Sequence, residues 1–200
     1  QALDFLVANS GNRRNLEVDF FGGEPLMNWH VVQQTIDYVH KQEKKHHKKI
    51  KMSLTTNGML LDKEKVKYLT DNHISLILSL DGRKEMHDRM RPDVNGNGTY
   101  DQIVKNLQYC VAHRNGEEYY VRGTFTRYNL DFTTDVEDML DHGFPAVSME
   151  PVVGEDTESY SIKEEDLPRV KEEYDRLAQL FIRREEEGRP FFFFHFNVDV

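Results

Sequence analysis

Residues 16–27 read Leu-Glu-Val-Asp-Phe-Phe-Gly-Gly-Glu-Pro-Leu-Met. The first six are mostly apolar or aromatic and predict a β-strand over residues 16–21. Gly22 and Gly23 end this strand and would let a ligand approach the backbone, whose N–H groups can act as donors. Glu24 then supplies a carboxylate suited to a cationic ammonium group, and Pro25 stiffens the turn. The plainer alternative is a strand-ending turn with a solvated glutamate.

The same order of a short apolar run followed by a helical pattern repeats along the chain. Strands are predicted at residues 16–21, 51–56, 74–80, 119–126 and 146–153, with a sixth candidate, buried on both sides, at 191–196. Helices are predicted after Asn28, Asp62 and Thr99, around Val136, and over residues 163–187, and the chain begins within a further helix. Alternating strands and helices imply an α/β fold with a parallel sheet, either a partial (β/α) barrel or an open doubly wound sheet.

Composition narrows the class of protein. The chain has 200 residues, a formal net charge of −9 and one cysteine, Cys110. The acidic balance disfavours a globally basic surface for nucleic acid. The sequence also disfavours a membrane span, a secretory leader and a disulfide framework, and the exclusion of these three features predicts a cytoplasmic protein.

Residues 41–51 contain six lysines. This run is either a solvated helix end or a docking patch for an acidic segment of a peptide or partner.

Polar residues follow the predicted strands, where ligands bind in parallel α/β folds. Asn57 ends the second strand, and Ser79 and Asp81 end the third. Arg122 lies in the fourth strand and would present a guanidinium fork suited to a carboxylate. Plainer alternatives exist: an Asp-Gly turn at Asp81, a turn cap by Asn57, and an ion pair of Arg122 with Glu150 or another carboxylate.

These segments, taken in order, resemble the radical S-adenosylmethionine (SAM) enzymes. The matching motifs are Gly22-Gly23-Glu24-Pro25, Thr55-Thr56-Asn57-Gly58, Ser79-Leu80-Asp81-Gly82 with His87-Asp88, Arg91 and residues 96–100, and Val121-Arg122-Gly123-Thr124-Phe125-Thr126. The set is most similar to the peptide-modifying branch with C-terminal Cys-rich, SPASM-type extensions. That branch includes anaerobic sulfatase-maturating enzymes and thioether-forming (SCIFF-type) peptide maturases, which the ending His195-Phe196-Asn197-Val198-Asp199 also resembles.

The resemblance implies a cofactor site. SAM would be bound by Gly22, Gly23, Glu24 and Pro25 through its amino group, with Asn57, Ser79, Asp81 and Arg122 as further contacts. Ser79 would help hold the carboxylate or ribose, and Arg122 would pair with the carboxylate. Replacing Glu24 with Gln is then expected to weaken SAM binding and to leave folding little changed. The substrate implied is a peptide or protein, Cys-rich in the closest branch. No residue is expected to act as an acid–base catalyst.

The chain departs from the family pattern in one respect. The CxxxCxxC motif that ligates a four-iron four-sulfur cluster is absent from the 200 residues, and Cys110 lies on an apolar helix face. No metal ligand is therefore assigned. The expected unit is a truncated core, residues 1–200, holding strands two to six. Its barrel is open because the first strand, like the cluster ligands and the SPASM-type domain, would lie outside, and its exposed sheet edges invite self-association.

Two other interpretations remain open. A cluster-less α/β module that binds peptides or regulates a partner would also lack the cysteines. An unrelated nucleotide-binding α/β protein is weakened by the absence of a GxGxxG or GxxxxGK[ST] signature.

Overall fold

A computed structural model describes residues 1–196. Its strands are β1 (Asn15–Phe20), β2 (Lys49–Thr56), β3 (Ser75–Ser79), β4 (Tyr119–Phe125), β5 (Ala146–Pro151) and β6 (Phe192–Phe193). The helices are α1 (Ala2–Asn9), α2 (Trp29–His46), α3 (Lys63–Asp71), α4 (Lys84–Met90), α5 (Tyr100–Ala112), α6 (Phe132–Asp141) and α7 (Leu167–Glu186). Short 3₁₀ turns at Pro25–Asn28, Arg127–Asn129, Glu164–Asp166 and Phe194–Phe196 adjoin them.

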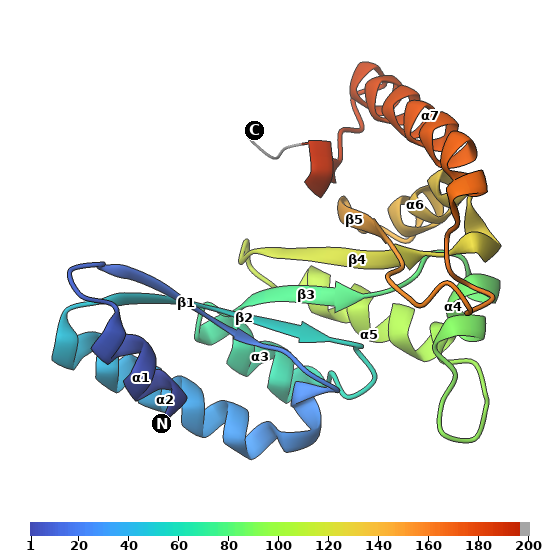
Figure 1. The fold of residues 1–200 in the computed structure, drawn as a ribbon. Coiled ribbons are helices and arrows are strands. Elements are labelled where there is room, and N and C mark those ends of the chain that lie inside the picture. The colour runs from blue at the N-terminus through green and yellow to red at the C-terminus, as the bar shows by residue number, and fades with distance from the viewer. Residues whose placement is uncertain (197–200) are drawn as a thin grey trace.

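The strands form one parallel sheet in the order β1-β2-β3-β4-β5-β6, so that neighbours in sequence are neighbours in space. β1 and β6 do not pair with each other among the described residues, and the sheet curves without closing (Figure 1). The predicted α/β class and open, barrel-like parallel sheet are thereby confirmed. The carboxyl ends of the strands lie at one rim of the sheet, and the amino ends lie at the other.

The two faces of the sheet differ. On β2, Ile50, Met52 and Leu54 are buried while the residues between them are not, and β3 and β4 repeat this alternation. Successive side chains of a strand point to opposite faces, so one face is apolar and the other is polar. Helices pack against the apolar face, and none among the described elements covers the other (Figure 1). We call the uncovered face the inner face.

The outer core consists of the apolar face and one stripe of each helix. Val32, Ile36 and Val39 recur at helical spacing on α2 and are buried. Leu69 of α3 and Leu107 of α5 are buried in the same core. Burying a side chain of this size stabilises the fold by about 1.5–3 kcal/mol, so these stripes fix the helices to the sheet.

The last predicted strand is wrong in length and in burial. β6 has two residues rather than six, and the chain then turns into a 3₁₀ segment. Phe193 is fully buried, but Phe192 is 44% exposed and Phe194 is 37% exposed. The reason is the open inner face: alternate aromatic side chains of this segment point away from the helices. Residues 197–199 of the predicted ending motif lie outside the described residues.

No helix within residues 1–196 is long and apolar enough to cross a lipid bilayer.

Gly123 on β4 provides a test of this packing. A Cβ added there would lie 2.7 Å from the Leu80 carbonyl oxygen and 2.7 Å from the Met139 methyl carbon. The backbone oxygen cannot move without distorting the sheet, so Gly123→Ala is expected to destabilise the protein by about 1–3 kcal/mol in urea unfolding. Gly23→Ala is the matched control, because an added Cβ there meets nothing within 4 Å. Equal midpoints for the two variants would contradict the packing.

Candidate functional site

The carboxyl ends of β1 to β4 surround a cavity of about 180 Å³. Because parallel strands end at the same rim, loops distant in sequence meet there. It is lined by two glycines, one aromatic residue and seven polar or charged residues, namely Phe21, Gly22, Gly23, Thr55, Thr56, Asn57, Ser79, Arg91, Arg122 and Thr124. Five of the residues singled out in the sequence, Gly22, Gly23, Asn57, Ser79 and Arg122, are brought together here. We call it the rim cavity.

The Gly-Gly segment forms one wall of the rim cavity. Gly22 has φ +129°, a backbone conformation that side chains other than glycine rarely adopt. No atom lies within 4 Å of a Cβ added at Gly22 or Gly23, so the backbone on this side faces open space. A ligand can therefore approach the peptide groups of this segment directly.

Glu24 has a role that the sequence did not indicate. Its Oε1 accepts hydrogen bonds from the Leu26 backbone N–H (3.0 Å) and the Thr56 hydroxyl (2.9 Å). Its Oε2 accepts from the Asn57 backbone N–H at 2.8 Å. The carboxylate thus ties the loop after β1 to the end of β2. Glu24 and Pro25 are not among the residues that line the cavity. Pro25 begins the 3₁₀ turn whose N-terminus Glu24 caps.

Asn57 lines the cavity and also caps a turn. Its Oδ1 accepts a hydrogen bond from the Met59 backbone N–H at 3.0 Å. The side-chain amide nitrogen is left available for another partner. The two interpretations of Asn57 are therefore compatible.

Ser79 and Arg122 lie side by side, because they are paired in the register of β3 and β4. Arg122 Nη2 lies 3.0 Å from Glu150 Oε2, so the predicted alternative of an ion pair with Glu150 is present. Both partners are about one-third exposed, and the guanidinium also reaches the rim cavity. Arg122 is thus ion-paired with Glu150 and is also one of the residues that line the rim cavity.

Asp81 does not line the rim cavity but holds a residue that does. It is 3% exposed, and its carboxylate receives two hydrogen bonds from Arg91, Nε to Oδ2 at 2.6 Å and Nη2 to Oδ1 at 3.0 Å. The Thr124 backbone N–H donates to Oδ1 at 3.0 Å. Asp81 therefore orients Arg91, which lines the cavity. Asp81 was predicted from the sequence as a SAM contact and Arg91 was not, although Arg91 belongs to the same motif.

A buried histidine fixes the loop that carries Arg91. His87 is fully buried, and its Nδ1 accepts from the Asp81 backbone N–H at 3.2 Å. Its Nε2 lies 3.1 Å from the Thr99 hydroxyl, which donates to the Arg91 carbonyl at 2.7 Å. This assigns the proton to Nε2. Burial lowers the pKa of His87 to about 4, so the ring is neutral at physiological pH.

A second cavity, of about 580 Å³, occupies the amino-terminal half of the inner face. It is lined by Lys51 and Ser53 of β2, Ser75 and Ile77 of β3, and Tyr120 of β4, among other residues. These alternate positions continue to Thr55, Ser79 and Arg122 at the rim, so the two cavities share one face of the sheet. Tyr120 stacks on Phe194 with ring centroids 5.4 Å apart, which forms an aromatic wall. We call this space the inner-face cavity.

The chain's own residues do not fit an iron–sulfur cluster. Its single cysteine, Cys110, is buried on α5, and burial raises the pKa of the thiol to about 11. Within residues 1–196 no group of three or more His, Cys, Asp or Glu side chains is placed to hold a metal ion.

An open parallel sheet with a polar cavity at its carboxyl rim defines an α/β protein of the partial-barrel class. The family model of the radical SAM superfamily matches residues 8–141, and the chain belongs to that superfamily.

Proteins of similar sequence support the assignment to this superfamily. The chain is 28% identical over 123 residues to the radical SAM cyclopropyl synthase TigE of Paramaledivibacter caminithermalis, covering 60% of this chain and 25% of TigE. It is 30% identical over 115 residues to a cysteine-type anaerobic sulfatase-maturating enzyme of Clostridium novyi, covering 56% of this chain and 30% of that enzyme. The matches thus span a quarter to about a third of these relatives.

Solved structures share the fold. The structure of native anSMEcpe with bound AdoMet (SAM) and the Kp18Cys peptide superposes with a TM-score of 0.81 at 20% identity. The match covers 98% of this chain and 55% of that one. Streptococcus suis SuiB bound to SAM gives a TM-score of 0.57 at 19% identity, over 84% of this chain and 37% of that one.

The ties made by Glu24 lead to a stability prediction. In Glu24→Gln an NH₂ group replaces one carboxylate oxygen. This group then faces either the Asn57 N–H or the two donors at the other oxygen, the Leu26 N–H and the Thr56 hydroxyl. A buried donor left without an acceptor costs about 1–3 kcal/mol, so the variant is expected to unfold at lower urea concentration. The control is Glu158→Gln, in an exposed loop. This replaces the sequence-based expectation that folding would change little, and equal stability of the two variants would restore that expectation.

His87 leads to a pH prediction. In the unfolded chain its pKa is near 6.5, whereas the folded ring is protonated only near pH 4. Between these values the unfolded state binds more protons. The free energy of unfolding therefore falls on acidification through this window, by up to about 3 kcal/mol. In urea titrations at several pH values, His87→Gln should show less of this loss than the wild type and than the exposed-site control His46→Gln. Parallel curves for all three proteins would contradict the assignment.

Proposed function

We propose that this chain is the SAM-binding core of a radical enzyme that modifies a peptide. The observation that carries the proposal is the composition of the rim cavity. The open backbone of Gly22 and Gly23, the Ser79 hydroxyl and the Arg122 guanidinium line one small space at the carboxyl rim. These groups complement a ligand that carries an amino group, a hydroxylated ring and a carboxylate.

The amino-acid end of SAM fits the rim cavity. Its carboxylate would pair with Arg122 or with Arg91, which Asp81 orients. Its ammonium would meet carbonyl oxygens of the Gly22–Gly23 segment. About 180 Å³ is less than the roughly 300–1,000 Å³ of most ligand pockets, so the remainder of the molecule would extend over the inner face.

A peptide substrate would occupy the inner face. The inner-face cavity, at about 580 Å³, lies within the usual range for ligand sites and continues to the rim cavity. Two similarities support this proposal: one relative is a sulfatase-maturating enzyme, and one structure with the same fold was solved with a bound peptide. That the peptide is Cys-rich, that the protein is cytoplasmic, and that sheet edges such as β1 mediate self-association stay predictions.

In the family, SAM bound beside a four-iron four-sulfur cluster supplies a 5′-deoxyadenosyl radical that removes hydrogen from the substrate. Cys110 is buried and does not fit the cluster, so we propose that the ligands lie outside these 200 residues. The residues of this chain bind and orient the cofactor and substrate and limit access of water. None of them needs to exchange a proton with the reacting atoms.

Arg122→Gln tests the cofactor site. Glutamine retains a hydrogen bond toward Glu150 but removes the charge offered to the carboxylate. We expect SAM affinity, measured by equilibrium dialysis, to fall about tenfold to a hundredfold, which corresponds to a lost charge-assisted bond of roughly 1.5–3 kcal/mol. Glu150→Gln is the control, because it breaks the same ion pair and leaves the guanidinium free to bind.

The two variants separate the proposed role from a purely structural one. Retained affinity in Glu150→Gln together with loss in Arg122→Gln supports a ligand contact. Equal loss in both would show that the ion pair only maintains the fold. No SAM binding by the wild-type protein would favour the alternative, a peptide-binding or regulatory module without the cofactor.

A further inference from the structure

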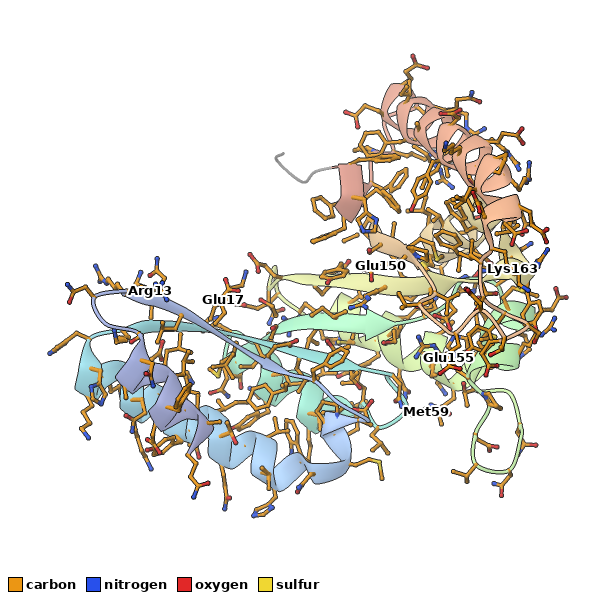
Figure 2. The ribbon with its side chains drawn as sticks, viewed as in Figure 1. Arg13, Glu17, Met59, Glu150, Glu155 and Lys163 are labelled. Carbon is orange, nitrogen blue, oxygen red and sulfur yellow. The ribbon has the colours of Figure 1, made fainter. Side chains whose placement is uncertain are left out.

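An exposed group of basic side chains lies at the amino-terminal rim of the sheet, opposite the rim cavity. Arg13 and Arg14 precede β1, and Lys44 and Lys45 lie in the last turn of α2. Lys48 immediately precedes β2, and Lys49 is its first residue. All except the half-buried Lys48 are exposed. We call these six residues the basic rim. Figure 2 shows Arg13 at this end of β1 and Met59 beyond the other end of β2.

The turn before β1 is tied to the end of α2, so the basic rim is a single surface. Lys48 Nζ donates to the carbonyls of Gly11 (2.9 Å) and Arg13 (2.7 Å). The Lys49 backbone N–H donates to the Arg14 carbonyl at 2.8 Å. His47, in a left-handed conformation with φ 53°, ends the helix and turns the chain into β2. The backbone that carries the charges is therefore held in place before any partner binds.

The charges of the basic rim are not neutralised within the described part of the chain. None of the six side chains forms an ion pair there, although Lys45 is close enough to help lower the pKa of Asp4. Elsewhere, arginines such as Arg83, Arg127 and Arg183 are paired with carboxylates. In a chain of net charge −9, a patch that remains positive is a recognition feature for an anionic partner, because such patches steer and orient binding.

We propose that the basic rim binds an acidic stretch of the peptide substrate, an inference that rests on the proposed function. A short acidic segment of a peptide can match the basic rim in length, so that all of its charges lie on the patch. A nucleic acid would extend beyond the patch into the field of an acidic protein, and the six residues include no aromatic ring on which bases could stack. The Debye length, about 10 Å at 0.1 M salt, confines the attraction to the patch itself.

The position of the basic rim also predicts a spacing in the substrate. β2 has eight residues between the two rims, a length of about 26 Å at roughly 3.3 Å per residue. An extended peptide bound on the inner face needs about the same number of residues to cross it. The residue placed at the rim cavity is therefore about eight or more positions from the acidic stretch.

Binding is tested directly with a fluorescein-labelled peptide of ten alternating Glu and Gly residues. The variant Arg13→Gln/Arg14→Gln/Lys44→Gln/Lys45→Gln should bind it at least tenfold more weakly by fluorescence anisotropy. The control, with Lys63, Lys67, Lys105 and Lys171 changed to Gln, removes the same charge elsewhere and should bind like the wild type. Raising salt from 50 to 200 mM should weaken wild-type binding and affect the four-site variant less.

Three outcomes would overturn the proposal: no wild-type binding of the peptide, equal loss in the control, or tighter binding of a ten-residue oligothymidylate than of the peptide. SAM affinity is measured on the same proteins. Unchanged SAM affinity in the four-site variant shows that its fold is intact. A wild-type protein that binds the acidic peptide but does not bind SAM would refute the proposed function alone.

The spacing has its own test. Peptides carry a benzophenone either three or nine residues beyond the acidic stretch, and photo-crosslinks are mapped by mass spectrometry. Only the longer spacing should label residues 55–57 or 79. Labelling of these residues from the shorter spacing would overturn the proposed alignment of the peptide.

Discussion

The structure depends on a parallel sheet that has helices on only one of its faces. Side chains of a strand alternate between faces, so every second residue enters the helix-covered core and the others face a space that no described helix fills. Parallel strands buried on both faces read as continuous apolar runs, but these strands do not. This arrangement leaves part of each strand without apolar burial. On β2 the residues concerned are Lys51, Ser53 and Thr55, none of which is buried. In return, one uncovered face of the sheet connects the two cavities and carries both polar side chains and the aromatic pair Tyr120 and Phe194.

The site is held by charged groups that mostly act on the protein itself. Glu24 joins the first loop to the end of β2, and Asp81 fixes Arg91 from a buried position. His87 supports the same loop as a neutral ring. These contacts set the positions of backbone and guanidinium groups before a ligand arrives, which lowers the entropy lost on binding. The rim cavity therefore depends on residues such as Glu24, Asp81 and His87, which do not line it.

Much of this arrangement could be predicted from the sequence. Apolar periodicity located β1 to β5 and most of the long helices, and the loop motifs located five residues of the rim cavity. Other features required coordinates. The seven-residue α4 is too short to show a period, and β6 is shortened because its aromatic side chains alternate toward an open face. Two partners of Glu24, Thr56 and Asn57, lie about thirty residues away in sequence, and no local pattern records a contact across that distance.

The order of the strands has a consequence for how the protein forms. Each strand pairs with the next one in the chain, from β1 through to β6, and the intervening helix lies against the pair. The partner of each strand is therefore the next strand to be synthesised. The paired residues of neighbouring strands are 22 positions apart at the closest pairing, Ser53 with Ser75, and 46 at the most distant, Ala146 with Phe192, so each pairing closes one strand–helix–strand loop. The strand–helix units of this sheet can therefore be added one at a time, in the order in which they are synthesised.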